Sequence, residues 1–142
     1  MESEGVLVRR AQTADLTQIA NIHGRNKRAT IAALKKSLKL HECIVAESKG
    51  RIMGYGCMNY AFFGRGFVSI LYVAKAARRR GTGNRLLAAF EAECRSERIF
   101  TSTNLSNLPM QSLLNSRSYR LSGVVQDLDP GDPELFYSKQ LR

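Results

Sequence analysis

Apolar side chains occupy alternate positions at the start of the chain and then recur at helical spacing. Valines at every second position predict a strand over residues 5–10. Apolar residues then return every three or four positions, which predicts two helices in succession. Thr13 and Thr30 are placed to cap these helices, with Asp15 in the first turn of the first helix and Gly24 at its end.

Short apolar and β-branched segments follow, separated by glycine-containing turns, and predict a β-meander. Its strands are expected over residues 43–47, 51–63 and 67–73. A long amphipathic helix is predicted over residues 82–97. The last elements are expected to be a strand over 99–103, a helix over 109–116 that opens with proline, and a hairpin of 119–126 with 134–141.

The resulting order, β-α-α-β-β-β-α-β-α-β-β, predicts an α/β fold with a mixed, mostly antiparallel twisted sheet flanked by helices. No repeat, low-complexity segment or linker divides the sequence, so one domain is expected over residues 1–142. A chain of this length can bury an ordinary core. The composition, 44% hydrophobic and 24% charged, is typical of a soluble globular protein.

Sequence features of membrane or secretory targeting are absent. No apolar run approaches the roughly 20 residues that span a bilayer. The first five residues lack the basic and then apolar order of a secretory signal. We therefore expect a cytoplasmic protein without a membrane partner.

The three cysteines, Cys43, Cys57 and Cys94, are far apart and include no CxxC pair. Their odd number and spacing indicate neither a disulfide framework nor a zinc site. Each lies in an apolar stretch, which predicts buried free thiols. Because His23 and His41 are the only histidines, no metal centre is expected.

The formal net charge of +10 indicates a polyanionic partner: nucleic acid, an anionic surface or a phosphorylated cofactor. Residues 70–84, ILYVAKAARRRGTGN, narrow this choice. A strand runs into clustered arginines and two glycines, and a helix begins at once. Gly81 and Gly83 lack the Cβ atoms that would keep a phosphate from the backbone, and the helix start presents unpaired N–H groups. The segment predicts a pyrophosphate cradle, with a solvated basic turn as the alternative.

Other phosphate-binding loops fit this segment less well. The P-loop pattern GxxxxGK[ST] is absent from the sequence, and Leu86 occupies the place of the third glycine of the dinucleotide fingerprint. The segment closely resembles the acetyl-CoA-binding signature of the GNAT superfamily: Arg or Gln, two variable residues, Gly, one variable residue, then Gly or Ala. Arg78, Gly81 and Gly83 match it. The order of elements is also that of the family, and residues 107–119 match a second family segment more loosely.

This resemblance implies acetyl-CoA as co-substrate, with its pantetheine arm beside a splayed strand and its pyrophosphate on the loop. The backbone of Leu71 and Val73 would bond the pantetheine, and Asn107 would contact the arm. The pyrophosphate would be held mainly by backbone N–H groups of Arg78, Arg79, Arg80, Gly81, Thr82, Gly83 and Asn84.

The resemblance also implies direct attack of an amine on the thioester within a ternary complex, with a backbone N–H at Tyr72 or Val73 polarising the carbonyl. The family's usual acid is a tyrosine seven residues after the asparagine. Leu114 occupies that position and cannot donate a proton. The family glycine before the last aromatic is also replaced, by Ser118.

The general base stays open, because residues 64–77 contain no Asp or Glu. The candidates are a water chain or the side chains of Glu42, His23, His41, Tyr55, Tyr60 and Tyr72. By resemblance, the acceptor would enter beside residues 25–28 and the acidic hairpin 127–132. An ordinary polar turn is the alternative for that hairpin.

Three functions follow from these observations. The first is an N-acetyltransferase that acts on a primary amine of a small molecule or a protein. The second, motivated by Leu114, is a CoA-binding protein without catalysis. The third is a basic nucleic-acid-binding module, which the lack of Trp, the 8% aromatic content and the absence of RNA-binding motifs disfavour. By analogy with the family, the protein is also expected to form a homodimer.

Overall fold

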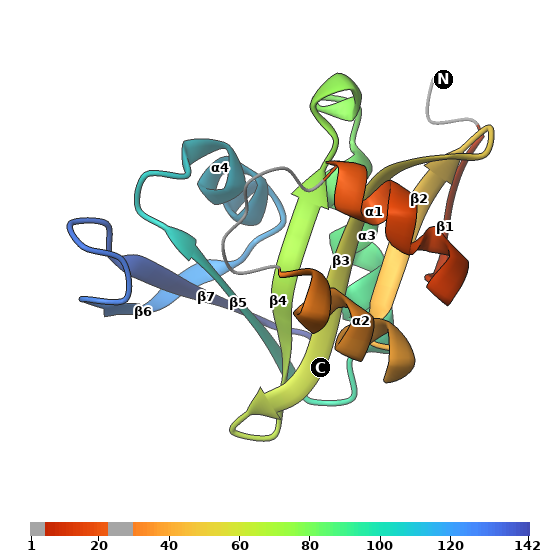
Figure 1. Cartoon of the computed structure of the whole chain (residues 1–142). Coiled ribbons are helices and arrows are strands. Elements are labelled where there is room, and N and C mark those ends of the chain that lie inside the picture. Colours follow the sequence, from red (N-terminus) through yellow and green to blue (C-terminus); the bar gives the residue numbers. More distant parts are fainter. Residues whose placement is uncertain (1–4, 23–29) are drawn as a thin grey trace. The chain divides into compact units, whose positions relative to one another are not determined.

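The computed structural model describes residues 5–22 and 30–142 (Figure 1). Seven strands form one sheet in the order β1-β2-β3-β4-β5-β7-β6. The elements, with two single-turn 3-10 segments η1 and η2, are β1 (Val6–Arg10), η1 (Thr13–Asp15), α1 (Leu16–Ile22), α2 (Ile31–Lys39), β2 (Cys43–Ser48), β3 (Arg51–Phe62), β4 (Arg65–Val73), η2 (Lys75–Ala77), α3 (Thr82–Glu93), β5 (Arg98–Asn104), α4 (Leu108–Ser116), β6 (Arg120–Val125) and β7 (Glu134–Gln140).

The predicted order of helices and strands is confirmed. The pairs β1–β2, β2–β3, β5–β7 and β6–β7 are antiparallel, whereas β4 and β5 run parallel. A parallel pair needs a crossover connection, and α3 supplies it. The mixed, mostly antiparallel sheet flanked by helices is therefore the fold that the sequence predicts.

The chain divides into two compact units, which are described separately. The first contains the residues up to Met58 together with Ile70–Ala92. The second contains Asn59–Ser69 and Glu93–Arg142. That residues 1–142 form one domain stays a prediction.

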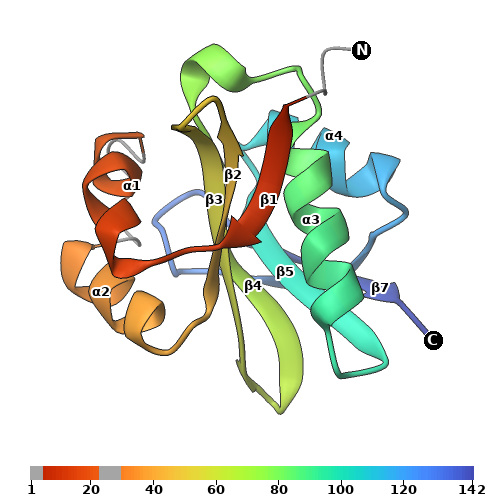
Figure 2. The ribbon, with the colours of Figure 1, turned by 90° about the vertical axis from the view of Figure 1, so that its right-hand side faces the viewer.

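In the first unit, α1 and α2 cover one face of the β1–β3 strands and α3 covers the other (Figure 2). Two glycines of β3 allow α3 to come close. A Cβ on Gly54 would lie 2.9 Å from the carbonyl oxygen of Tyr72, and one on Gly56 would lie 2.8 Å from the ring of Phe90. Neither distance is compatible with a side chain, so glycine is required at both positions.

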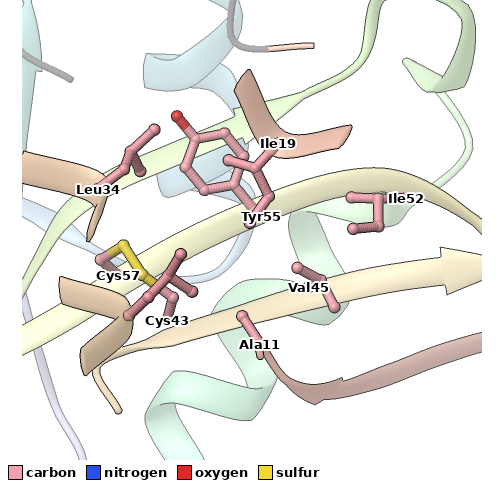
Figure 3. Packing of buried hydrophobic residues seen from close by; sticks show 9 residues of the cluster. Ala11, Ile19, Leu34, Cys43, Val45, Ile52, Tyr55 and Cys57 are labelled. Carbon is pink, nitrogen blue, oxygen red and sulfur yellow. A yellow bond between two sulfur atoms is a disulfide. The ribbon is translucent and has the colours of Figure 1, made fainter. Parts of the chain in front are cut away.

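The opposite face of β3 carries Tyr55, whose ring is fully buried beneath α1 and α2 (Figure 3). The residues drawn around it in Figure 3 are Ala11, Ile19, Leu34, Cys43, Val45, Ile52 and Cys57. The alternation along β3 thus sends large side chains to the first two helices and leaves glycines toward α3.

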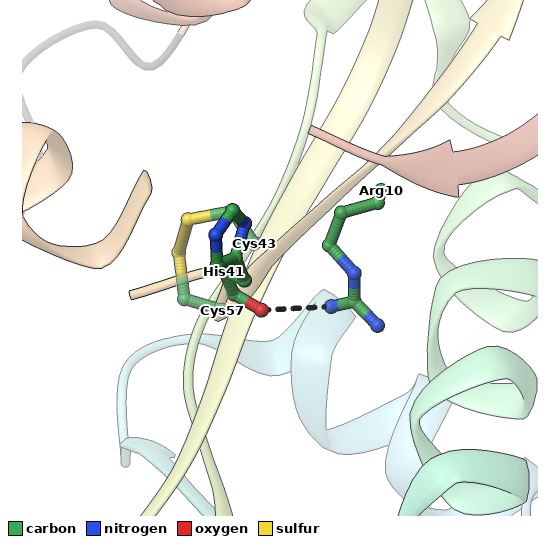
Figure 4. The surroundings of a disulfide bond; sticks show 4 residues. All are labelled: Arg10, His41, Cys43 and Cys57. Carbon is green, nitrogen blue, oxygen red and sulfur yellow. Dashed lines mark hydrogen bonds between the residues drawn. A yellow bond between two sulfur atoms is a disulfide. The ribbon is translucent and has the colours of Figure 1, made fainter. Parts of the chain in front are cut away.

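The expectation of free thiols is wrong for Cys43 and Cys57, which form a disulfide between β2 and β3 (Figure 4). The two residues stand directly opposite each other in the strand register, with their Cα atoms 4.2 Å apart. Spacing along the sequence does not show this register, which is why the pair was missed. Cys94 is buried and free, as predicted. Beside the disulfide, Arg10 Nη1 donates to the carbonyl oxygen of His41 at 3.1 Å (Figure 4).

Two predicted helix boundaries also need correction. Thr13 does not cap the first helical segment, because it lies inside the 3-10 turn that Gln12 precedes. The carboxylate of Asp15 accepts from the backbone N–H of Gln12 at 2.7 Å and takes over the capping. At the other end, α3 stops at Glu93 rather than residue 97.

In the second unit, α4 begins and ends with defined caps. The side chain of Asn107 accepts from the N–H of Met110 at 3.1 Å. At its end, the N–H of Ser118 donates to Asn115 and that of Tyr119 to Leu114, which is a Schellman motif. Ser118 has φ +70, the left-handed conformation that favours glycine. The position where the family has glycine therefore keeps the backbone of glycine.

We expect Ser118→Gly to raise the free energy of unfolding by about 1 kcal/mol, because glycine adopts the left-handed conformation without a steric cost. Urea denaturation measures this change. Ser116→Gly, in the last turn of α4, is the control and should lower stability by about 0.5–1 kcal/mol. Stabilisation by both or by neither variant would contradict the assignment.

A second prediction concerns Asp15. Hydrogen bonds from Arg9, with Nη1 2.9 Å from Oδ2, hold the pKa of this carboxyl below its usual value. Asp15→Asn should lower the free energy of unfolding at neutral pH by about 1.5–3 kcal/mol, the range for hydrogen bonds to charged groups.

The difference between wild type and Asp15→Asn should shrink as the pH falls below about 4, because a carboxyl with a depressed pKa stabilises the fold only while it is ionised. Denaturation at a series of pH values tests this. Exposed Glu97 provides the control Glu97→Gln, which should have little effect at any pH. A difference that is independent of pH would refute the ionic contribution of Asp15.

Candidate functional site

The basic turn follows β4 in the first unit. The N–H of Ala74 donates to the carbonyl oxygen of Met53 at 2.8 Å, which ties the end of β4 to β3. The chain then makes the short turn η2 and reaches α3 through residues 78–81. Arg79 and Gly81 both have left-handed backbones, with φ +67 and +81. The turn thus takes a specific conformation before the helix begins.

The N-terminus of α3 faces this turn. Its first helical bond runs from the N–H of Arg85 to the carbonyl oxygen of Gly81, at 3.0 Å. The N–H groups of Thr82 and Gly83 precede that bond, at the positive end of the helix dipole. Both residues are buried, and no described atom lies within 4 Å of where a Cβ on Gly81 would be. The turn is therefore open at Gly81 and anchored at the start of α3.

Arg78 holds the turn against the end of β4. Its Nε donates to the carbonyl oxygen of Val73 at 3.1 Å, and Nη2 donates to the Tyr72 hydroxyl at 3.3 Å. The guanidinium also lies 5.5 Å from the centroid of the Tyr72 ring. Arg79 and Arg80 are exposed. The structure thus brings Arg78 together with two of the predicted strand residues and leaves the next two arginines at the surface.

The strand residues Leu71, Tyr72 and Val73 are half-buried. The parallel register of β4 with β5 runs from Gly66 to Val68, so these three residues lie beyond it. Asn84 is exposed in the first turn of α3, in the same unit. Asn107 belongs to the second unit, where its side chain caps α4. All predicted cradle residues from Arg78 to Asn84 are therefore contiguous in the first unit, whereas Asn107 is not part of it.

Leu114, at the position of the family's usual acid, is fully buried in α4. Its side chain is part of the core and offers no proton. Among the tyrosines, Tyr60 accepts a hydrogen bond from the N–H of Arg95 at 3.0 Å and packs under its guanidinium at 4.1 Å. These contacts give Tyr60 a structural role.

The surroundings of Tyr55 do not suit a general base. Burial, with a smaller contribution from Tyr72, raises the pKa of its hydroxyl far above the usual value. The hydroxyl has no hydrogen-bond partner among the described residues. His41 is exposed and Glu42 half-buried. His23 and residues 25–28 lie outside the described residues.

The acidic hairpin between β6 and β7 forms hydrogen bonds with Asn104 and Ser106, at the end of β5 and just after it. The carboxylate of Asp132 accepts from the N–H of Ser106 at 3.0 Å and from its hydroxyl at 2.6 Å. Asp129 accepts from the side-chain amide of Asn104 at 2.9 Å. These bonds favour the alternative of a structural turn for residues 127–132.

Sequence reasoning missed Glu134, the first residue of β7. It follows a Pro- and Asp-rich turn, where an exposed carboxylate is the usual expectation. In the structure it is only 1% exposed. The sequence signal for this burial is that Glu134 directly precedes Leu135, Phe136 and Tyr137, which predict a strand that enters the core.

Within residues 5–22 and 30–142, no three His, Cys, Asp or Glu side chains come together to hold a metal ion. In the same ranges, no helix is both long and apolar enough to cross a membrane.

Comparison with known proteins agrees with this geometry. The family model described as acetyltransferase (GNAT) family matches residues 11–119. No curated protein matches the sequence. A GNAT-family acetyltransferase from Bacillus cereus ATCC 10987 has 31% identity and a TM-score of 0.88, with 95% of this chain and 96% of that chain covered.

Two more distant structures share the fold. Ard1 from Thermoplasma volcanium has 13% identity and a TM-score of 0.87, over 97% of this chain and 99% of its own. The yncA protein from Salmonella typhimurium, solved with its cofactor acetyl-CoA, has 18% identity and a TM-score of 0.78, over 98% of this chain and 95% of its own. With a family model that spans most of its length, this chain belongs to the GNAT acetyltransferase family.

Proposed function

We propose that this protein transfers the acetyl group of acetyl-CoA to a primary amine by direct attack within a ternary complex. The observation that carries the proposal is the turn between β4 and α3, with left-handed backbones at Arg79 and Gly81 and a helix N-terminus behind it. Such a turn suits a pyrophosphate. Family membership supplies the chemistry, and the yncA relative was solved with acetyl-CoA.

In this proposal each predicted residue has a role in holding acetyl-CoA. The backbone of Leu71 and Val73 bonds the pantetheine, and N–H groups of residues 78–84 bind the pyrophosphate. Arg78 fixes the turn through the carbonyl oxygen of Val73 and adds positive charge. The backbone N–H of Tyr72 or Val73 polarises the thioester carbonyl. Asn107 contacts the cofactor arm.

The reaction proceeds in this proposal without a side-chain acid at the position of Leu114. The nitrogen forms a bond to the thioester carbon, the C–S bond breaks, and the sulfur leaves as a thiolate. A thiol pKa near 8.5 makes it an adequate leaving group. The amine loses its proton to a water chain or to one of the side chains of His23, His41, Glu42 and Tyr72.

The finer properties belong to the same proposal. The acceptor is an amine of a small molecule or of a protein, and the enzyme works as a cytoplasmic homodimer. A CoA-binding protein without catalysis is the second candidate, because Leu114 removes the family's usual acid.

Titration calorimetry tests binding of acetyl-CoA. Gly81→Asp should weaken it by at least about tenfold, because it adds a negative charge to the anion-binding turn. Gly64→Asp is a matched control: Gly64 is also exposed, has φ +75, and has no described atom within 4 Å of its Cβ position. Equal affinity of both variants would refute the cradle. Clear binding of acetyl-CoA by wild type, without thiol release in an amine screen, would favour the non-catalytic candidate.

Tyr55→Phe should leave the transfer rate and its pH profile unchanged, because the buried hydroxyl stays protonated. It should not lower the free energy of unfolding, since it removes a buried polar group that has no hydrogen-bond partner among the described residues. Tyr60→Phe is the control and should lower stability by about 1 kcal/mol, because the N–H of Arg95 loses its acceptor. Loss of transfer in a folded Tyr55→Phe variant would make Tyr55 a functional residue after all.

A further inference from the structure

Strand β6 is the last of the seven described strands in the sheet order, and its inner side pairs with β7 (Figure 1). Its residues are exposed, apart from the half-buried Gly123. The ladder to β7 shifts once, between Leu121 and Gly123, and runs regularly from there to Val125. An edge strand presents unpaired N–H and C=O groups along its outer side, so β6 can accept a further strand.

The side chains of β6 are apolar on both faces of the sheet. Leu121 and Val124 pair with residues of one face of β7, whereas Val125 pairs with a residue of the opposite face. These three side chains are 54%, 47% and 40% exposed, respectively. No charged residue lies between Arg120 and Asp127 in the sequence. Because natural edge strands are usually protected by charges or proline, an apolar outer strand indicates that a partner covers it.

The face of Val125 is also hollowed. Phe136, which stands opposite Gly123 in the register, lies on this face and lines a hollow of about 350 Å³. The lining residues are Phe62, Phe63, Phe100 and Phe136 with residues 122–125. Phe63 is 79% exposed. A small molecule in this hollow would leave the apolar side chains of the other face in water, whereas a neighbouring strand covers both faces at once. The edge is therefore better suited to a strand than to a small ligand.

The two ends of β6 carry opposite charges. Arg120 begins the strand and Asp127 follows its end by two residues, and both are exposed. An antiparallel pair of identical strands brings the start of each strand beside the end of the other. Arg120 of each copy then lies near Asp127 of the other, so the same attraction forms at both ends of a two-fold interface. This self-complementarity of charge favours a second copy of the chain as the partner.

We propose that β6 is the interface of a homodimer, in which two copies pair antiparallel through the outer sides of this strand and continue one sheet into the other. The partner strand covers Leu121 and Val124 on one face, and Val125 beside the hollow on the other. The inference rests on the proposed function only for the homodimer, whose interface it names. An extended segment of another protein and a small apolar ligand are the competing occupants.

Sedimentation equilibrium of the full chain, over a series of concentrations and without acetyl-CoA, tests this interface. Wild type should dimerise. Val124→Lys should weaken the dimer by at least about tenfold, because a lysine on an edge strand places a charge against the incoming strand. The matched control is Leu7→Lys on β1, at the other end of the sheet order, since Leu7 is also apolar and 57% exposed. It should leave the dimer unchanged, and circular dichroism checks that each variant is folded.

Charge reversal tests the antiparallel arrangement even if Val124→Lys fails to fold. At low ionic strength, Arg120→Asp and Asp127→Arg should each weaken self-association by about fivefold or more, because each places like charges at both ends of the interface. An equimolar mixture of the two variants should form a heterodimer, in which both ends again carry opposite charges. Absence of this heterodimer, with both variants folded, overturns antiparallel pairing through β6.

The remaining outcomes also decide the proposal. A wild type that stays monomeric up to about 100 μM overturns it, and saturable binding of 2-phenylethanol to that monomer would assign the hollow to a small apolar ligand instead. A dimer that persists unchanged in Val124→Lys overturns it as well, because the interface then lies elsewhere. Since the dimer is measured without acetyl-CoA, failure of acetyl-CoA to bind refutes the proposed function and leaves this inference standing.

Discussion

The close approach of α3 to β3 is the constraint on which the first unit depends. A side chain on Gly54 or Gly56 would collide with the backbone of β4 or with a side chain of α3. Because both residues are glycine, α3 packs directly on the strands, and the N-terminus of α3 lies where β4 ends. Within the turn of residues 78–81, the side chain of Arg78 bonds the end of β4. Packing on one face of the sheet thus positions the basic turn several residues away.

In the second unit, several polar side chains have structural roles. Asp129 and Asp132 accept hydrogen bonds from residues just before α4, and Asn107 caps that helix. The exposed side chains of this unit include the apolar Phe63, Val124 and Val125 as well as charged ones such as Arg95 and Asp127. Catalytic groups therefore cannot be identified by charge alone here.

Much of the fold was predictable because its signals are local. The pattern of apolar residues predicted the order of strands and helices, and the Arg–Gly segment indicated the family. The two errors differ in origin. The partner of Cys43 depends on the register of β2 and β3, which arises only when segments distant in the sequence meet. The cap at Asp15 is local, because its carboxylate accepts from the N–H of Gln12 three residues earlier, so nearby residues do encode it.

The sequence by itself determined the element order, the basic turn and the absence of the usual acid, because each depends on residue type at a known spacing. Only the tertiary structure decided which side chains are accessible. It showed that the Tyr55 hydroxyl is buried, that Arg78 bends back onto β4, and that Gly123 pairs with Phe136 in the strand register. Burial and register are properties of several segments at once, so composition and spacing could not reveal them.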